Sequence, residues 1–572
     1  MNADDVFLLA KKYALQNAVQ FDGSANAKAV IGKVIAACKD NKELCPQQII
    51  PLVNKAVSQV NQLGVEQQQK ELETLAPELL VKQKKPRDFT LPDLPFAKKG
   101  EVITRFPPEP NGFLHIGHAK AAFIDAEYAL MYEGKFFLRF DDTNPDNAQV
   151  SFYDAQKQDL EWLGISWDKE YCTSSNLQTH YKLAEQLIKQ GDAYLCICSS
   201  DVIKDGRYHS KFCSCRHCAA GEMIDTWRGI IHGGEEAAIL RLVGDMQSAN
   251  TAMRDPTLFR VIETEHPLQG TKYRMWPTYD FAGAVEDSIS GVTHPFRTKE
   301  YELRDPVYFR ILSLLGLRKP HLMEFARLSI QGMPVSKRLI KPLIQKGVVQ
   351  GYDDPRLPTL RGLQRRGITP DAIKQFVFSQ GISKMESVVS FSSIEAVNRK
   401  LLDPVAKRFF FVPHPVQVVV DDAPKKTVEL PLHPTQDLGM RTIQISNVFY
   451  ISKEDAQLLQ QYKHIRLKEL YNISLKTTSE PLQATYAGTQ LVQDMPKVQW
   501  VGIDAIPFTV FIPGLLLQQD QTVNPNSMQT IHGLIEPAVQ NLKHGESIQC
   551  ERFGFIRLEK TKDGYKGIFS HK

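Results

Sequence analysis

Apolar residues recur at helical spacing along the first eighty residues of the chain. The first apolar stripe consists of Val6, Leu9, Ala10, Tyr13 and Ala18. Similar spacing returns in residues 29–35 and 49–60, and a period near 3.6 residues is typical of helices that bury one face. The pattern therefore predicts a helical N-terminal domain over residues 1–88.

From residue 98 to about residue 345, short β-type runs alternate with helical patterns. Such alternation predicts a doubly wound parallel sheet whose ligand site lies at the carboxyl ends of the strands. A cysteine-rich stretch and the residues after it, 192–275, are expected to form an insertion in this fold. Residues 346–402 have helical patterns.

Beyond residue 402 the pattern changes to short strands separated by turn residues. The clearest runs are 416–420, 427–432, 442–446, 498–501 and 553–558. Regularly spaced short strands predict β-barrels over residues 403–572. Together these patterns describe a multidomain α/β protein of 572 residues, in which 42% apolar and 23% charged residues are ordinary for a globular chain.

One junction between a predicted strand and a predicted helix has the layout of a phosphate-binding site. Residues 102–104 form a β-type run, Pro, Asn and Gly residues between 107 and 112 force a turn, and a helical pattern runs from Ile116 to Met131. His115 and His118 share the first helical turn, where free N–H groups favour an anion and imidazoles can donate to phosphate oxygens. Without this context, the pair would equally fit a metal site or two surface histidines.

A second basic segment, Val335-Ser-Lys-Arg338, follows about 220 residues later. Lys337 alone would be a solvated surface lysine. Paired with the two histidines, it is expected to reach phosphates from a loop that contains Gly332 and closes over a nucleotide. Residues 333–366 carry eight Lys and Arg against two Asp, a net charge of +6, although the whole chain carries only +4. This local charge can contact a phosphate backbone or simply face solvent.

Five of the nine cysteines lie close together in the chain. They are Cys196, Cys198, Cys213, Cys215 and Cys218. This density suits a tetrahedral zinc site with four thiolate or imidazole ligands, and we expect the first four cysteines to be the ligands. Cys218 is an alternative to Cys215, His209 and His217 are spare candidates, and a set of free cysteines is the remaining interpretation.

The histidine and lysine segments resemble known signatures. His115-Ile-Gly-His118 and Val335-Ser-Lys337 are similar to the HIGH and KMSKS-like motifs of class I aminoacyl-tRNA synthetases, with Val335 where the family usually has Met. The motifs that resemble the glutamyl/glutaminyl branch are Arg105-Phe-Pro-Pro-Glu-Pro-Asn-Gly112, Leu138-Arg-Phe-Asp-Asp-Thr-Asn-Pro145, Glu161-Trp-Leu-Gly164, Arg254-Asp-Pro256 and Tyr352-Asp-Asp-Pro-Arg356. The resemblance runs from about residue 98 to the last residue.

The resemblance implies a class I Rossmann-type catalytic domain over residues 98–345, with the insertion at 192–275 binding the tRNA acceptor end. Residues 346–402 become a helical connecting domain. Residues 403–572 become β-barrel anticodon-binding domains, which in this branch are typical of the archaeal/eukaryotic lineage. Residues 1–88 resemble the N-terminal extension of archaeal-type enzymes, and either tRNA docking or a stabilising or partner-binding role would fit them.

The resemblance also assigns roles around ATP. His115, His118 and Lys337 would stabilise the charge that develops on the phosphates during activation of the amino acid. The residues implied to contact ATP are Pro107, Glu109, Gly117, His118, Arg327, Ser336 and Lys337. Mg²⁺ is implied as the ion that accompanies ATP, and zinc is implied in the acceptor-binding insertion.

The amino-acid pocket should decide between glutamate and glutamine. The resemblance places Arg105 and Asp141 at the substrate's α-carboxylate and α-ammonium groups, and Tyr279 beside its side chain. Glutamyl enzymes have an arginine at the position of Arg297, where glutaminyl enzymes have a small uncharged residue. A guanidinium binds a γ-carboxylate more strongly than a neutral amide, so Arg297 predicts glutamate. The alternative role for Arg297 is a surface ion pair with Glu300.

The implied activity is therefore the ATP-dependent joining of L-glutamate to tRNA-Glu in the cytoplasm. Glutamine ligation and a non-catalytic tRNA-binding role are the alternatives. The sequence leaves open whether the enzyme also joins glutamate to tRNA-Gln. Among related enzymes, that second activity occurs together with an amidotransferase partner. Arg408 is a candidate tRNA contact by its position. No signal peptide and no apolar run of 18 residues is seen, so no membrane association is expected.

Overall fold

The computed structural model describes residues 3–20, 23–37, 46–76, 91–234, 237–562 and 564–572. The chain forms two compact units, Met1–Asp88 and Phe89–Lys572. Over the residues described, no helix combines the length and the apolar character that crossing a bilayer requires.

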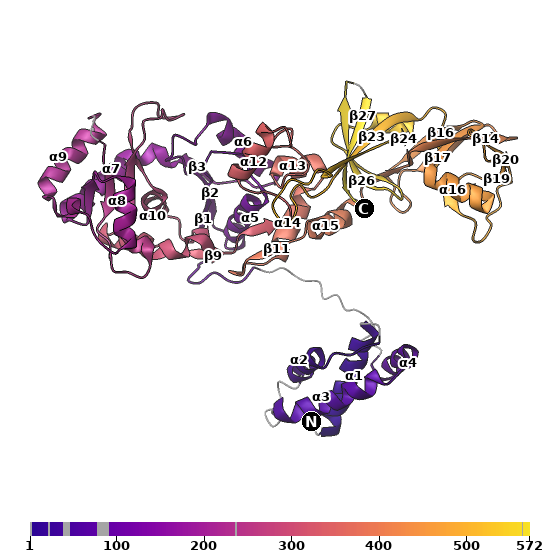
Figure 1. Cartoon of the computed structure of the whole chain (residues 1–572), viewed down its shortest axis with the longest axis horizontal. Coiled ribbons are helices and arrows are strands. Elements are labelled where there is room, and N and C mark those ends of the chain that lie inside the picture. The colour runs from indigo at the N-terminus through magenta and orange to yellow at the C-terminus, as the bar shows by residue number, and fades with distance from the viewer. Residues whose placement is uncertain (1–2, 21–22, 38–45, 77–90, 235–236, 563) are drawn as a thin grey trace. The chain divides into compact units, whose positions relative to one another are not determined.

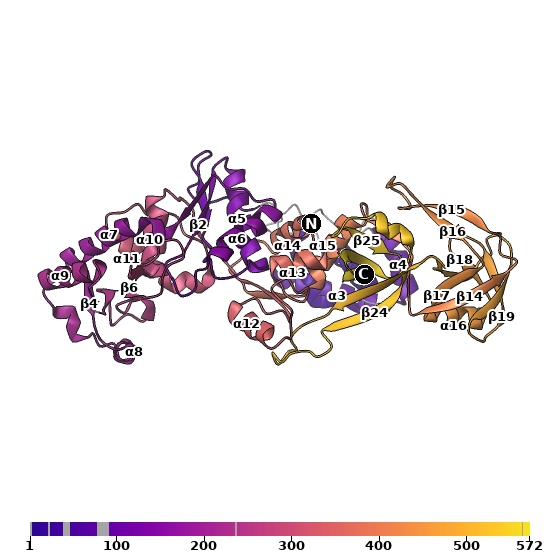
Figure 2. The ribbon, with the colours of Figure 1, turned by 90° about the horizontal axis from the view of Figure 1, so that it is seen from above.

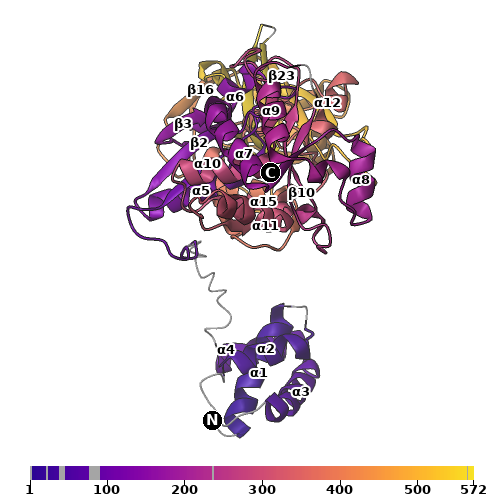
Figure 3. The ribbon, with the colours of Figure 1, turned by 90° about the vertical axis from the view of Figure 1, so that its left-hand side faces the viewer.

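The first unit is a group of four helices (Figure 3). They are α1 (Ala3–Gln20), α2 (Ala27–Ala37), α3 (Pro46–Asn61) and α4 (Val65–Leu75). The predicted apolar stripes meet in one core, in which Val6, Ala10, Val30 and Val53 are fully buried. The helical pattern is thus confirmed, whereas the predicted boundary at residue 88 lies outside the described residues.

The second unit starts with a parallel sheet that carries the first signature. Strands β1 (Ile103–Phe106), β2 (Lys135–Phe140) and β3 (Lys169–Cys172) pair in that order, and α5 (Ile116–Met131) and α6 (Val150–Trp162) are the crossover helices. Strands β8 (Phe296–Thr298) and β9 (Met323–Phe325) form a second parallel pair. The backbone N–H groups of Thr293 and His294 donate to the carbonyl of Ile103, so β8 begins beside the free edge of β1. In Figure 1 the strands β3, β2 and β1 are labelled one after another.

An antiparallel sheet interrupts this parallel core. It contains β4 (Ala193–Cys196), β5 (Ile239–Leu242), β6 (Thr257–Val261) and β7 (Met275–Pro277). Helices α7 (Leu177–Gln190), α8 (Ser200–Tyr208) and α9 (Ala220–Ile231) accompany it, and α10 (Tyr279–Ile289) and α11 (Asp305–Leu314) return the chain to the core. Trp227, Phe259 and Trp276 are fully buried in the cluster that joins these elements.

Short 3₁₀ helices fill several connections of the second unit. They are Thr173–Asn176, Ser214–His217, Thr251–Met253, Lys299–Arg304 and Pro537–Asn541.

The connecting region, residues 346–402, follows β10 (Leu328–Ile330) and α12 (Lys337–Gln345) and contains helices and one short strand. Its elements are α13 (Leu360–Arg366), α14 (Pro370–Ser379), β11 (Ser387–Val389) and α15 (Ser392–Leu402). The helical pattern predicted over residues 346–402 is confirmed by α13, α14 and α15, and the short strand β11 lies among them, where its β-branched run pairs in parallel with β10. Lys337 is the first residue of α12, and Ser336 is its N-cap, so Lys337 opens a helix rather than lying within the loop of Gly332.

Two seven-stranded sheets make up the rest of the chain (Figure 2). One sheet contacts the connecting helices and is called the nearer sheet; the other is called the farther sheet. The nearer sheet holds β12 (Lys407–Phe409), β13 (Phe411–Pro413), β23 (Ile506–Pro513), β24 (Met528–Ile535), β25 (Ser547–Cys550), β26 (Gly554–Thr561) and β27 (Gly564–His571). The farther sheet holds β14 (Pro415–Asp421), β17 (Val448–Ser452), β18 (His464–Leu467), β19 (Asn472–Thr477), β20 (Leu482–Tyr486), β21 (Lys497–Val498) and β22 (Val501–Gly502). The ribbon of β15 (Lys426–Pro431) and β16 (Met440–Ile445) and the helix α16 (Lys453–Tyr462) complete it. The sheets are barrel-like, as the strand pattern predicted, and the farther one is inserted between β13 and β23 of the nearer one.

The nearer sheet is attached to the connecting helices by specific bonds. The Ser570 hydroxyl donates to the carbonyl of Arg366, and the amide of Asn398 bonds the ring of His571 at 2.9 Å. The loop after β23 reaches the segment ahead of α12, where the N–H of Leu517 donates to the carbonyl of Gly332 at 3.0 Å. The last strand of the chain is therefore bonded to the connecting helices, and the loop after β23 contacts the segment that precedes the second signature.

Candidate active site

The first signature forms the N-terminus of α5. His115 is the N-cap residue, and its Nδ1 accepts from the N–H of Gly117 at 3.1 Å. The Nδ1 of His118 accepts from the N–H of His115 at 3.3 Å, which completes a capping box built from two imidazoles. The N–H of Ile116 donates to Pro358, so the segment before α13 holds this turn in place.

Both imidazoles are neutral donors in this arrangement. Their rings stack with centroids 3.9 Å apart. Burial, followed by the charges of His118 and Arg327, holds the pKa of His115 well below its usual value, and burial and Arg327 lower the pKa of His118 to about 4. Since both Nδ1 atoms accept backbone N–H groups, the neutral rings carry their proton on Nε2. Two Nε2–H groups are therefore available to an anion.

Gly117 is needed because the His115 ring lies against it. A Cβ atom at position 117 would stand 2.9 Å from Cε1 and 3.0 Å from Nδ1 of His115. Any larger residue would displace the ring that caps the helix.

A cavity of about 370 Å³ opens beside this helix end. Its wall is formed by Phe106, Pro107, Pro108, Glu109, His118, Asp141, Thr143, Asn144, Arg260, Tyr279, Ala282 and Tyr301. The carboxylate of Glu109 accepts from the amides of Asn111 at 2.5 Å and Asn147 at 3.2 Å. The structure thus brings together Pro107, Glu109 and His118, predicted near ATP, with Asp141 and Tyr279, predicted near the amino acid.

Arg105 lies behind the cavity wall rather than on it. Its side chain is 1% exposed, and its Nε and Nη2 donate to the two oxygens of Asp287 at 2.9 and 3.1 Å, while Nη1 donates to the carbonyl of Phe296. Arg139, also fully buried, donates to Asp287 at 2.7 Å and to Asp141 at 2.7 Å. The four side chains form a neutral network that holds Asp141 at the cavity.

Arg297 lies on β8 among tyrosine rings. Its guanidinium carbon is 5.7, 5.3 and 5.4 Å from the ring centroids of Tyr279, Tyr301 and Tyr308. Its side chain is 3% exposed, and Nε and Nη1 are buried without a hydrogen-bond partner among the described residues. Glu300, the alternative partner, instead forms an ion pair with Arg327 at 3.1 Å. The tyrosine rings therefore fix the guanidinium of Arg297, and its Nε and Nη1 groups donate to no group among the described residues.

The second signature is described in part. Arg327 is close enough to lower the pKa values of both histidines, and it is half-exposed. Ser336 caps α12 without a side-chain hydrogen bond. The side chain of Lys337 lies outside the described part of the chain, so only its backbone position at the start of α12 is given.

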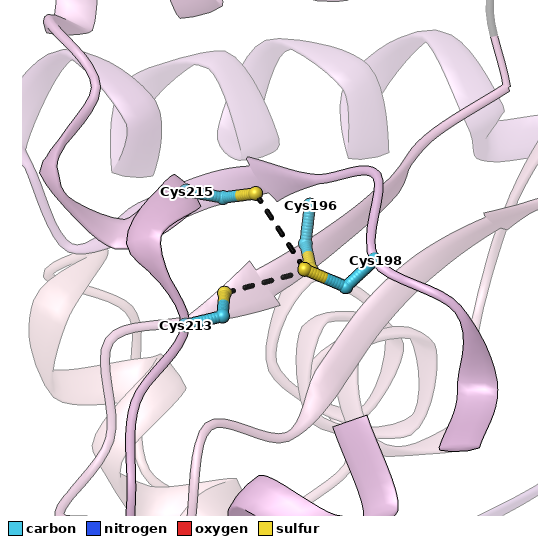
Figure 4. A group of neighbouring side chains, drawn as sticks. All are labelled: Cys196, Cys198, Cys213 and Cys215. Carbon is cyan, nitrogen blue, oxygen red and sulfur yellow. Dashed lines mark hydrogen bonds between the residues drawn. The ribbon is translucent and has the colours of Figure 1, made fainter. Parts of the chain in front are cut away.

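Four cysteines come together at the end of β4 (Figure 4). They are Cys196, Cys198, Cys213 and Cys215, whose sulfur atoms all lie within 4.8 Å of one another. The Sγ atoms of Cys196 and Cys213 are 3.7 Å apart, and those of Cys198 and Cys215 are 3.9 Å apart. Cys218, the sequence alternative, is exposed and outside this group.

These spacings fit a zinc ion. Four thiolates about 2.3 Å from a tetrahedral Zn²⁺ stand about 3.8 Å apart. The Nη1 of Arg241 lies 3.9 Å from Cys196 and 3.8 Å from Cys213, so a guanidinium is in place to support thiolate charge. Although burial opposes it, the hydrogen-bond contacts with Tyr194 and Cys196 and the charge of Arg241 lower the pKa of Cys213.

Arg408 lies far along the chain from the cavity, on β12. It is largely buried and forms an ion pair with Asp403 at 3.2 Å. Its contacts hold the start of the nearer sheet to the end of α15, so the structure does not bring Arg408 to the other candidate residues.

Sequence reasoning missed several residues of the site. Arg139 and Asp287 were visible as charged residues inside apolar runs, a strand and a helix, where a charge needs a buried partner. Tyr301 and Arg260 gave no comparable signal, because aromatic or basic residues at those spacings also fit a surface.

Comparison with known families agrees with this arrangement. The family model for the catalytic domain of class I tRNA synthetases (E and Q) matches residues 101–404. Two models for anticodon-binding domains of the same synthetases match residues 406–487 and 497–559. The chain belongs to the class I tRNA synthetases of the glutamate and glutamine type, and it is an aminoacyl-tRNA ligase.

Full-length relatives narrow the class further. The chain is 42% identical over 567 residues to a glutamate–tRNA ligase of Nitrosopumilus maritimus, with 98% of each chain covered. It is 42% identical over 568 residues to one of Cenarchaeum symbiosum, covering 98% of this chain and 99% of the relative. It is 39% identical over 584 residues to one of Pyrococcus furiosus, covering 99% and 100%. Within its family the chain is therefore of the archaeal glutamyl type.

Proposed function

We propose that this enzyme is a glutamate–tRNA ligase that activates L-glutamate with ATP and transfers it to the 3′ end of tRNA-Glu. One observation carries the choice of glutamate. Arg297 is buried among tyrosines beside the cavity, with Nε and Nη1 lacking hydrogen-bond partners in the described residues. A γ-carboxylate supplies two acceptors and a negative charge, whereas a glutamine amide leaves the buried charge unmatched.

The chemistry needs positioning and charge stabilisation. An α-carboxylate oxygen of glutamate attacks the α-phosphorus of ATP, and the bond to pyrophosphate breaks. The Nε2–H groups of His115 and His118 donate to the phosphate oxygens, and Lys337, at the start of α12, adds a positive charge. Mg²⁺, where it accompanies ATP, would supply neutralisation of phosphate charge. Asp141 receives the α-ammonium group, and Arg105, through Asp287, keeps Asp141 in place.

The second step transfers the glutamyl group. The 2′-hydroxyl of the terminal adenosine attacks the activated carbonyl carbon, and AMP leaves. We assign Zn²⁺ to the four cysteines, where it would hold the ends of β4 and the following loop together within the acceptor-binding insertion. The C-terminal sheets, including Arg408, would bind the anticodon half of the tRNA.

Aminoacylation tests the proposal directly. Purified enzyme is incubated with ATP, Mg²⁺ and labelled glutamate or glutamine, each with tRNA-Glu and tRNA-Gln transcripts. Glutamate on tRNA-Glu is expected, and glutamate on both tRNAs would indicate a non-discriminating enzyme that needs an amidotransferase downstream. Glutamine transfer would overturn the role of Arg297, and no transfer of either amino acid would favour the non-catalytic alternative.

A variant separates the pocket from the rest of the site. Arg297→Gln should raise the KM for glutamate about 100-fold or more, the scale of a lost charge-assisted bidentate pair, and leave the KM for ATP near that of the wild type. Arg399→Gln is a matched control, since Arg399 is exposed on α15 and donates to the carbonyl of Lys572.

A further inference from the structure

Asp305 is the charged partner that Arg297 has in the described part of the chain. Its Oδ1 lies 3.4 Å from Nη1 of Arg297. That distance exceeds the usual limit of about 3.2 Å for an N–H···O bond. Both atoms are buried, and neither has a hydrogen-bond partner among the residues that the structure describes. The contact therefore supplies opposite charge without a directional bond.

The orientation of Arg297 comes from elsewhere. Three tyrosine rings surround its guanidinium, and its backbone is fixed by the pairing of β8 with β9, where Arg297 lies opposite Glu324. Asp305 is thus not required to aim the guanidinium. It makes a buried positive charge tolerable when no substrate is bound.

A second carboxyl group, that of Glu324, disfavours the ionised form of Asp305. Glu324, on β9, has a buried Oε1 without a partner, and its other oxygen pairs with Lys384. Lys384 also binds Glu302, at 3.1 Å. Burial, together with the neighbouring Glu324, raises the pKa of Asp305 to about 6, although Arg297 acts in the opposite direction.

We propose that Asp305 is a specificity-determining counter-ion that balances Arg297 in the empty pocket and sets the affinity for the substrate's γ-carboxylate. A bound γ-carboxylate next to Arg297 is a like charge for Asp305, so an ionised Asp305 weakens glutamate binding. A neutral amide experiences no such repulsion. This inference rests on the proposed function, and it adds a residue that limits how tightly glutamate is held.

The charge arrangement predicts a pH dependence. The charged groups that face Asp305 are Arg297 on β8, Glu324 on β9 and Lys384 between α14 and β11, and Glu302 lies one contact further away. Hydrogen bonds to Glu324 and Glu302 raise the pKa of Lys384, so Lys384 keeps its positive charge between pH 5.5 and 7.5. The KM for glutamate should therefore rise across this range as Asp305 ionises, while the KM for ATP is measured in parallel to remove effects on the nucleotide site.

The experiment is steady-state aminoacylation of tRNA-Glu by the full-length enzyme. Asp305→Asn should lower the KM for glutamate roughly three- to tenfold at pH 7.5, the scale of one like charge at intermediate dielectric, and should flatten its pH profile. Glu324→Gln should act in the opposite direction, because Asp305 then ionises more completely and the KM for glutamate rises near pH 6. Glu302→Gln, which removes a carboxylate from the same chain of contacts further away, should leave the KM for glutamate unchanged.

The outcomes separate this inference from the proposed function. If the wild type transfers no glutamate, the proposed function fails. If the wild type is active and Asp305→Asn leaves the KM for glutamate unchanged or raises it, with the KM for ATP intact, Asp305 is not a competing counter-ion. If Asp305→Asn does not fold, Glu324→Gln decides, since an unchanged KM and pH profile in that variant would also overturn the inference.

Discussion

Replacing Asp287 with asparagine removes the central charge from the network behind the cavity. In the wild type, two guanidinium groups, Arg105 and Arg139, are balanced by two carboxylates, Asp141 and Asp287. The side chains of Arg105, Arg139 and Asp287 are each at most 1% exposed. An asparagine oxygen can still accept both bonds made to Oδ1. Its NH₂ group would face donors of Arg105 and Tyr308, at the position where Oδ2 now accepts at 3.1 Å.

The expected cost follows from the unmatched charge. Breaking a buried ion pair by removing one partner costs about 3–5 kcal/mol. At 1.36 kcal/mol per factor of ten, this corresponds to about 10²- to 10⁴-fold faster amide exchange in the strands that carry the arginines. Hydrogen exchange measured by mass spectrometry on peptides covering β1 and β2 would record it, and peptides from the N-terminal unit serve as an internal control.

A second substitution tests the reasoning. Adding Arg105→Met to Asp287→Asn makes the network neutral again, because Arg139 retains Asp141 as its partner. The double variant should therefore recover part of the lost protection. Wild-type exchange in the single variant, or a double variant whose loss equals or exceeds the sum of the two single losses, would show that charge balance is not what stabilises this wall.

Three further outcomes are expected. Gly117→Ala should slow glutamate activation at least about tenfold, because the added Cβ would displace the ring of His115. Pyrophosphate exchange in the presence of tRNA measures this rate, and a normal rate would remove the imidazole cap from the mechanism. The pKa of His118 is about 6.5 in the unfolded chain and about 4 in the folded one, so thermal stability should fall as the pH is lowered from 6.5 to 4. The fall should be shallower in His118→Asn, and equal slopes in the two proteins would contradict the low pKa. Elemental analysis should find one Zn²⁺ per chain. Cys215→Ser should lose the ion and Cys218→Ser should retain it, and the reverse result would make Cys218 the fourth ligand in place of Cys215.

Local patterns predicted much of the fold. The helix from Ile116 to Met131 has the predicted ends, because the proline-rich turn before it and the glycine after it leave little freedom. Short strands of the C-terminal half were also evident from their β-type runs between turn residues, and β16 alternates strictly between buried and exposed positions. The four-cysteine group was predictable by ligand density, and the four expected members are those whose sulfur atoms converge. Spacing in the chain alone left Cys218 as an alternative to Cys215.

Long-range partners were beyond the reach of sequence patterns. Arg105 was expected on the cavity surface by resemblance, yet its partner Asp287 lies 182 residues away and holds it behind the wall. The same holds for Asp305, whose relation to Arg297 and Glu324 depends on β8 and β9 lying side by side. The insertion of one seven-stranded sheet into another also left no local trace, because each strand is an ordinary short strand by itself.

The path of the chain through the two C-terminal sheets sets an order of events during synthesis. Strand β12 pairs with β25, and Lys407 must wait for Ile548 to leave the ribosome. At about 5–20 residues per second, that delay is about 7–28 s, during which β12 and β13 have unpaired edges. The final strand, β27, then attaches to α13 and α15. A chain that stops before β25 would therefore leave β12 without its partner strand, and an unpaired strand edge of this kind favours association with other chains.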